Sequence, residues 1–216
     1  MKKTTTAALA IVSAFALASC SAGPTGTSTL QPARTSTVSK EIESPVLGNA
    51  ASKVEVKIFS DYQCPACQRF HSLIEGKLVK DYVDTGKVKL VYKSYPLPQH
   101  QNAEGDAVAS FCALSQGKFT EFSEKMYTLE EAKANVDVTD AERLEVAKFA
   151  GVADIPAFET CLKEGWYVNR MKKDMQDGDR LGLDHTPSIY VNDKIMDFKS
   201  VEEFFSILDA SVAAAK

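Results

Sequence analysis

The alternation of apolar and polar positions predicts a strand, a helix and a second strand in the first half of the chain. Residues 53–60 (KVEVKIFS) alternate with period two, as on a half-buried strand. Apolar residues then recur at helical spacing across residues 70–82. Residues 87–97 (KVKLVYKSYPL) form another β-like run, so this part of the chain is typical of a βαβ unit.

Helical periodicity dominates the middle of the chain, and β character returns near its end. The predicted helical segments are residues 102–117, 118–129, 139–151 and 155–182, the last one without a break. Thr139 and Glu142 are spaced as a capping box. Two short strands are expected around a turn at Asn192 and Asp193, before a final helix that Ser200 caps. The predicted order is β-α-β, an all-helical insert, then β-β-α.

The first 45 residues have the composition of an export and anchoring segment. A basic start and an apolar stretch at residues 7–18 predict a signal peptide over residues 1–19, because the stretch is too short for a membrane span. Residues 17–20 (LASC) resemble a bacterial lipobox, which implies a lipid on Cys20; the alternative is ordinary cleavage beside an incidental cysteine. Residues 20–45, rich in Ser, Thr, Pro and Gly, are expected to be a disordered tether.

Composition narrows the function classes. The chain has 216 residues, 44% of them hydrophobic, and a formal net charge of −4, so it can bury a core and has no basic stripe for nucleic acid. It also has no glycine-rich phosphate loop and no recognisable Ser/His/Asp arrangement. We therefore expect neither a cofactor nor a nucleic-acid partner.

Four cysteines remain once Cys20 is assigned to the lipid: Cys64, Cys67, Cys112 and Cys161. In an oxidising compartment an even set favours disulfides over zinc. Pairing within C-x-x-C leaves Cys112 and Cys161. These two are expected to form a structural disulfide; the alternatives are a second redox relay and two unpaired thiols. The C-x-x-C spacing itself serves a redox pair, a local staple or a metal site, to which His71 could add a third ligand.

Three segments carry a resemblance to a known family. Residues 59–70 (FSDYQCPACQRF), 95–122 and 185–196 (HTPSIYVNDKIM) resemble segments of the bacterial DsbA-like thiol:disulfide oxidoreductases of the thioredoxin superfamily, in particular their membrane-attached branch. The resemblance runs from about residue 46 to the C-terminus. It implies an α/β thioredoxin fold built from residues 46–98 and 183–216, with residues 99–182 as an all-helical insertion domain.

The same resemblance implies roles for individual residues. Cys64 matches the exposed nucleophile and Cys67 the buried resolving cysteine. Pro187, preceded by Thr186, matches the cis-proline that packs against the cysteine pair and offers a backbone edge to an extended substrate. A thiol at a helix N-terminus is expected to have a lowered pKa. His185 is expected at the rim of this site, either tuning Cys64 or solvated, and His100 is expected to be structural.

Two positions depart from the family pattern. Ile58 stands where thioredoxin-like proteins often have a buried acid, which leaves Asp61, Glu55 and Lys93 as candidates for a proton relay. Ala66 stands where strong oxidants have a histidine between the cysteines. Since stabilising the thiolate makes a stronger oxidant, we predict a less oxidising potential than the value of about −120 mV given for such an oxidant.

These features together predict an extracytoplasmic lipoprotein on the periplasmic or cell-surface face of a membrane, acting as a monomer. Its expected activity is to form disulfides in exported proteins that carry thiols or disulfides, with a membrane redox partner that recycles the cysteine pair. A reductase or isomerase on the same scaffold is the close alternative. A non-catalytic peptide- or metal-binding lipoprotein is the more distant one.

Overall fold

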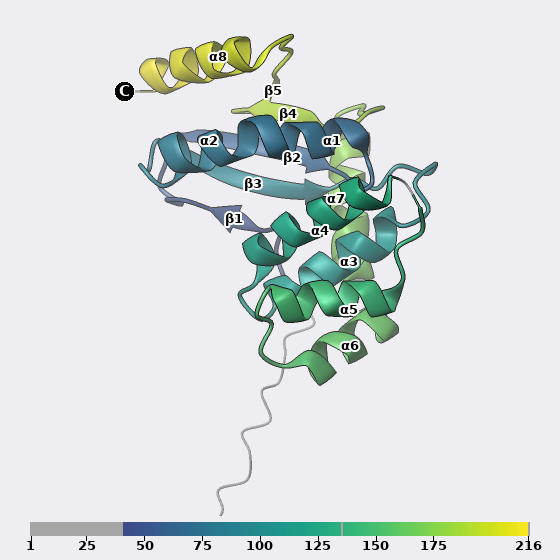
Figure 1. Cartoon of the computed structure of the whole chain (residues 1–216). Coiled ribbons are helices and arrows are strands. Elements are labelled where there is room, and N and C mark those ends of the chain that lie inside the picture. Colours follow the sequence, from purple (N-terminus) through teal and green to yellow (C-terminus); the bar gives the residue numbers. More distant parts are fainter. Residues whose placement is uncertain (1–40, 135, 216) are drawn as a thin grey trace, which may run out of the picture. The chain divides into compact units, whose positions relative to one another are not determined.

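The computed structural model describes residues 41–134 and 136–215, so the predicted signal peptide, the lipid site at Cys20 and most of the tether lie outside it. Within this range one mixed sheet has the strand order β1-β3-β2-β4-β5 (Figure 1). Its strands are β1 (Val46–Leu47), β2 (Val54–Ser60), β3 (Val88–Ser94), β4 (Ser188–Val191) and β5 (Lys194–Ile195). Strands β2 and β3 are parallel, and every other neighbouring pair is antiparallel. The predicted β-α-β and β-β-α halves are both present.

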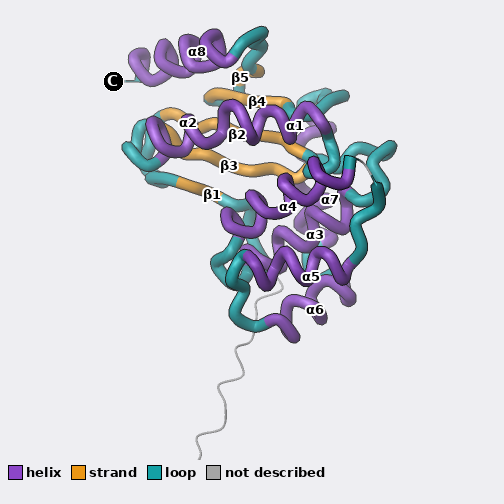
Figure 2. The backbone as a smooth tube through the Cα atoms, in the orientation of Figure 1, coloured by secondary structure: helices purple, strands orange, loops and turns teal. Residues whose placement is uncertain are grey.

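Alternation along β2 separates the two faces of the sheet. Val54, Val56 and Ile58 lie on one face, packed against the helices that follow β2 and β5 in the chain (Figure 2). Phe59 lies on the other face, in a cluster with Tyr95. The covering helices on the first face are α1 (Pro65–Phe70), continued by the π-helical segment η1 (His71–Glu75), α2 (Gly76–Leu78) and a second π-helical segment η2 (Val79–Val83), and α8 (Val201–Ala214).

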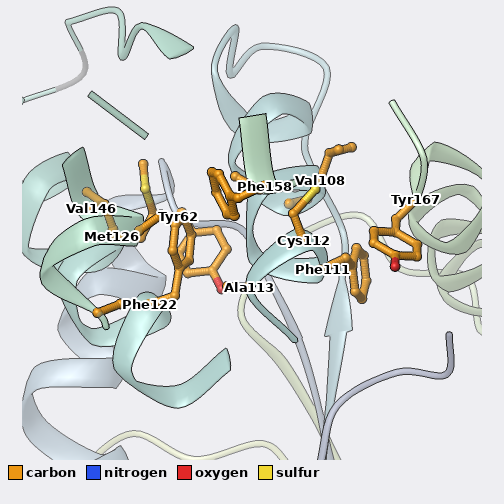
Figure 3. Packing of buried hydrophobic residues seen from close by; sticks show 14 of the residues in the cluster. Tyr62, Val108, Phe111, Cys112, Ala113, Phe122, Met126, Val146, Phe158 and Tyr167 are labelled. Atoms are coloured by element: carbon orange, nitrogen blue, oxygen red, sulfur yellow. The ribbon is translucent and has the colours of Figure 1, made fainter. Parts of the chain in front are cut away.

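Five helices, which follow β3 and precede β4 in the sequence, form a second buried cluster. They are α3 (Ala103–Leu114), α4 (Phe119–Lys133), α5 (Asp140–Phe149), α6 (Ile155–Glu164) and α7 (Val168–Arg180). Figure 3 shows aromatic side chains at the centre of this cluster, among them Phe111, Phe122 and Phe158, all nearly fully buried. A disulfide joins Cys112 of α3 to Cys161 of α6. Because the cluster also contains the side chains of Cys64 and Cys67, the helices contribute directly to the surroundings of the cysteine pair.

The predicted helix caps and the predicted turn are present in the structure. The side chains of Thr139 and Glu142 form the reciprocal capping box at the start of α5. Ser200 caps α8 by accepting a hydrogen bond from the backbone N–H of Glu203. Asn192 and Asp193, at the turn between β4 and β5, both have positive φ angles, a conformation that asparagine and aspartate tolerate better than most residues.

Two predictions about boundaries are wrong. The helix expected over residues 155–182 is interrupted, because α6 ends at Gly165 in the left-handed conformation (φ 63°) and α7 starts afresh at Val168. The tether expected to extend through residue 45 is packed before that point. Ser44 is 8% exposed and donates a 2.7 Å hydrogen bond to Asp174 of α7, so polar contacts, which composition does not reveal, fix this segment.

Among the helices within residues 41–134 and 136–215, none is both long and apolar enough to cross a bilayer.

Candidate active site

Cys64 lies at the junction of β2 and α1, as the N-cap residue of the helix. Its backbone N–H donates to the carbonyl of Asp61 (3.1 Å), and Pro65 occupies the first helical position, where no intrahelical N–H donor is needed. The expected exposed position of Cys64 is wrong: its side chain is only 6% exposed, and that of Cys67 is 1% exposed. The loop before β4 accounts for this, because the Cys64 Sγ lies 3.3 Å from the carbonyl oxygen of Thr186.

The surroundings of the two sulfurs drive their pKa values in opposite directions. A hydrogen bond from Cys67 is the largest cause that lowers the pKa of Cys64 to about 5; burial opposes it, and the backbone N–H groups of Ala66 and Cys67 reinforce it. Burial raises the pKa of Cys67 well above its ordinary range, and the hydrogen bond and charge of Cys64 add to this. At neutral pH Cys64 is therefore a thiolate and Cys67 a thiol, which is the charge distribution needed for one attacking sulfur.

The loop before β4 contains the Thr186–Pro187 bond, which is cis. Pro187 borders a groove of about 450 Å³ that is also lined by residues of α1, η1, β5 and the segment between β5 and α8. Apolar side chains line much of this groove, including Leu73, Ile195 and Phe198. The groove therefore offers an extended peptide apolar contacts beside the cysteine pair.

His185 also lines this groove, but it does not lie against the sulfurs. Its side chain is 63% exposed, and its Nδ1 lies 2.7 Å from a carboxylate oxygen of Asp184. The partners of the Cys64 sulfur are Cys67 and Thr186. The structure thus brings His185 to the rim of the groove, whereas its expected tuning role stays a prediction.

The three candidates for a proton relay are separated in the structure. Glu55 pairs with Lys57 and Lys89 on the sheet surface, and Lys93 pairs with acids of α7. Asp61 alone adjoins the C-x-x-C turn. It is 3% exposed, accepts hydrogen bonds from the backbone N–H groups of Gln63 and Leu97, and lies 2.7 Å from Nδ1 of His100. Burial raises the pKa of the Asp61 carboxyl.

One contact to the cysteine pair was not foreseen from the sequence. The hydroxyl of Ser60, the last residue of β2, forms a hydrogen bond with the Cys67 sulfur and lies 2.7 Å from the hydroxyl of Tyr127 in α4. No local pattern identifies Tyr127, because its helical spacing only predicts burial within the insert. Its role depends on how α4 packs against the end of β2.

His71 is placed away from a metal-binding arrangement with the cysteines. Its Nδ1 lies 2.9 Å from a carboxylate oxygen of Glu75, and its ring stacks on that of Tyr127 at a centroid distance of 4.5 Å. Across residues 41–134 and 136–215, no three His, Cys, Asp or Glu side chains are grouped so that they could hold a metal ion.

Comparisons with known proteins agree with this geometry. The family model for thioredoxin matches residues 40–210. Disulfide bond formation protein D of Bacillus subtilis is 27% identical over 168 residues, which cover 74% of this chain and 74% of that protein. The crystal structure of oxidised BdbD from Bacillus subtilis gives a TM-score of 0.72 at 27% identity, covering 79% of this chain and 93% of that chain.

A more distant solved structure extends the likeness of the fold. DsbA of Chlamydia trachomatis gives a TM-score of 0.68 at 18% identity and covers 83% of this chain and 96% of that chain. The predicted thioredoxin fold with a helical insertion is confirmed, and the chain belongs to the thioredoxin family, as one of its DsbA-like thiol:disulfide oxidoreductases.

Proposed function

We propose that this protein is a membrane-tethered, extracytoplasmic enzyme that forms disulfides in exported proteins. The observation that carries the proposal is the position of Cys64 at the N-terminus of α1, beside Cys67 and the Thr186 carbonyl, where its pKa is lowered and that of Cys67 is raised. A stabilised thiolate favours the reduced form of the pair, so the oxidised form tends to take electrons from substrate thiols. The name of the Bacillus subtilis relative, disulfide bond formation protein D, supports the same direction.

The reaction begins with the oxidised pair, in which Cys64 and Cys67 share a disulfide. A substrate thiolate attacks the Cys64 sulfur, a mixed disulfide forms, and Cys67 leaves as a thiolate that takes up a proton. A second substrate thiolate then attacks the substrate sulfur of the mixed disulfide, and Cys64 leaves as a thiolate. The substrate loses two electrons and the cysteine pair gains them. A membrane redox partner with a disulfide accepts these electrons when it reoxidises the pair.

The groove beside Pro187 is the proposed binding site for the substrate. Leu73 and Ile195 are 64% and 47% exposed, large fractions for apolar side chains that line a groove. Arg69 and Lys199 add positive charge to its lining, and Asp197 adds a negative charge. An extended, apolar segment of an unfolded exported protein fits this chemistry, with the backbone at Thr186 and Pro187 aligning its thiol against Cys64.

A reductase or isomerase is the second candidate, because the pKa of Cys64 is intermediate. Its value of about 5 lies between the values of about 3.5 and about 7 given for a strongly oxidising DsbA and for thioredoxin. An intermediate pKa suits chemistry in either direction, and the membrane partner then decides the net flow of electrons.

One experiment separates these functions. The chain from residue 21 is tested for oxidation of a reduced model protein and for reduction of insulin, as wild type and as Cys64→Ser. We expect oxidation to dominate and to be lost in Cys64→Ser. Dominant insulin reduction would favour the second candidate, and oxidation that survives in Cys64→Ser would exclude the proposed mechanism.

The membrane tether has its own test. We expect Cys20→Ala in the full-length chain to move the protein from the membrane fraction to the soluble fraction without loss of redox activity in the purified protein. An unchanged membrane fraction would contradict lipid attachment at Cys20.

A further inference from the structure

The buried sulfur of Cys67 has to lose and regain a proton, yet no acid side chain occupies the position expected for a buried acid. Ile58 is at that position, 2% exposed, within the apolar core. Besides Cys64, the partners of the Cys67 sulfur include the backbone N–H of Asp61 and the hydroxyl of Ser60, and this hydroxyl in turn faces that of Tyr127. Ser60 is hydrogen-bonded to Cys67, and its Oγ lies 2.7 Å from the Tyr127 hydroxyl. Since Cys67 is 1% exposed and Tyr127 is 7% exposed, solvent has little access to this arrangement.

The Tyr127 ring contacts two aromatic neighbours. Its centroid lies 4.6 Å from that of Tyr62 and 4.5 Å from that of His71, whose ring is nearly parallel to it at 22°. Glu75 anchors the His71 ring through a 2.9 Å contact to Nδ1. These two ring contacts hold in place the Tyr127 ring, whose hydroxyl lies 2.7 Å from the Ser60 Oγ.

Burial is the main reason that the Tyr127 hydroxyl stays protonated. Burial raises the pKa of Tyr127 well above its ordinary range, and negative charge on Cys67, Tyr62 and Glu75 adds to the effect. The pKa of His71, whose ring stacks on that of Tyr127, is also shifted. Burial lowers this pKa, but the hydrogen bond and charge of Glu75 outweigh burial and raise it. Tyr127 thus stays a hydrogen-bond donor throughout the pH range in which the thiols titrate.

We propose that Ser60 is a catalytic residue that donates a hydrogen bond to the Cys67 thiolate, and that Tyr127, supplied by the helical insert, is the positioning residue that orients the Ser60 hydroxyl. This inference rests on the proposed function and deepens it, because it assigns the group that makes the resolving sulfur competent. It also assigns the helical insert a part in the chemistry of the cysteine pair.

Both hydroxyls can rotate, so the pair serves both states of the sulfur. When Cys67 is a thiol, its S–H points to Ser60 and the Ser60 hydroxyl points to Tyr127. When Cys67 is a thiolate, Tyr127 donates to Ser60 and Ser60 donates to the sulfur. The donated hydrogen bond stabilises the charged form, which is the nucleophile in reoxidation and the leaving group in substrate oxidation.

The step that this arrangement assists can be followed with glutathione disulfide as the oxidant of the reduced protein. The Cys64 thiolate attacks it, giving a mixed disulfide and one glutathione thiolate. Cys67 then loses its proton and attacks the Cys64 sulfur, so that the Cys64–Cys67 bond forms and the bond from Cys64 to glutathione breaks. The second glutathione leaves as a thiolate and takes up a proton, and two electrons pass from the protein to glutathione disulfide.

The test compares Tyr127→Phe, Ser60→Ala and Ser60→Thr, with Tyr62→Phe as the matched control. Tyr62 is also buried, but its hydroxyl lies 2.6 Å from Ser123. The lifetime of the mixed disulfide is followed against pH by mass spectrometry of acid-quenched samples. Loss of the hydrogen bond to the charged sulfur predicts about tenfold slower resolution at neutral pH in Ser60→Ala, with an upward shift of about one unit in the pH profile. Tyr127→Phe removes a bond between neutral groups, so we expect a change in the same direction of about threefold. Tyr62→Phe should stay near wild type, and Ser60→Thr, which keeps a hydroxyl, should resolve the mixed disulfide faster than Ser60→Ala.

A second measurement does not depend on turnover. In a Cys64→Ala background, the pKa of the Cys67 thiol is measured by thiolate absorbance, with and without Tyr127→Phe. We expect Tyr127→Phe to raise it. An unchanged pKa, or an equal effect of Tyr62→Phe, would overturn the inference. If the proposed function itself fails, the wild-type protein oxidises no substrate. If only this inference fails, the wild-type protein oxidises its substrate, and Tyr127→Phe does not change the rate at which the mixed disulfide is resolved.

Discussion

Removal of the Cys67 thiol should raise the pKa of the Cys64 thiol, because the hydrogen bond from Cys67 is the largest cause of its low value. The variant Cys67→Ala removes the donor and leaves the backbone N–H groups at the start of α1 in place. Cys67→Ser is the matched control, since its hydroxyl can still donate to the Cys64 sulfur.

The size of the effect follows from the charge on the acceptor. A hydrogen bond to a charged group contributes about 1.5–3 kcal/mol, and one pKa unit corresponds to about 1.4 kcal/mol. We therefore expect the pKa of Cys64 to rise from about 5 by about one to two units in Cys67→Ala, and by less in Cys67→Ser. The backbone N–H groups of Ala66 and Cys67 keep it below the ordinary thiol value.

The assay is a pH titration of thiolate absorbance in the reduced protein. The lowered pKa of Cys64 also sets the sign of a stability effect. The thiolate stabilises the reduced fold fully above the ordinary thiol pKa of 9.0, and this contribution is lost as pH falls through about 5. A Cys64 pKa that is the same in wild type and Cys67→Ala would refute the assignment of Cys67 as the main stabilising donor.

Three further predictions test other parts of the account. Ala66→His places a cation between the cysteines and should shift the glutathione equilibrium by about tenfold toward the reduced pair; an unchanged equilibrium would contradict the role given to this position. The double variant Cys112→Ala, Cys161→Ala opens a loop with a sequence separation of 49 and should lower the free energy of unfolding by about 4 kcal/mol in urea titrations while oxidase activity remains. Gly178→Ala puts a Cβ 2.5 Å from the Tyr95 ring, so urea unfolding should show a loss of about 1–3 kcal/mol; wild-type stability would mean that the ring moves freely.

The sheet and the cysteine pair could be predicted because their signals are local. The alternation at residues 53–60 places Val54, Val56 and Ile58 on one face, and the structure has them there. The helix after Cys64 begins at Pro65, a residue that suits the first helical position because no N–H donor is needed there. Such features depend on neighbours in sequence, which a pattern records directly.

Other features depend on contacts between distant segments. Ser44 is fixed by Asp174, a partner 130 residues away, so its composition alone suggested a tether. Gly165 interrupts a helical pattern that continues on both sides, and its positive φ angle begins the turn at residues 165–167 that separates α6 from α7. Tyr127 contacts Ser60 although 67 residues separate them in the sequence, so no local pattern at either position predicts the contact.

The central claim is that Cys64 is the attacking sulfur and Cys67 resolves the intermediate. It is tested most directly by reacting reduced Cys67→Ala and reduced Cys64→Ala with a peptide that contains a disulfide, then mapping the adduct by mass spectrometry. The account predicts a stable mixed disulfide on Cys64 in Cys67→Ala, formed rapidly at neutral pH, and little adduct on Cys67 in Cys64→Ala. Faster adduct formation at Cys67 than at Cys64 would contradict it.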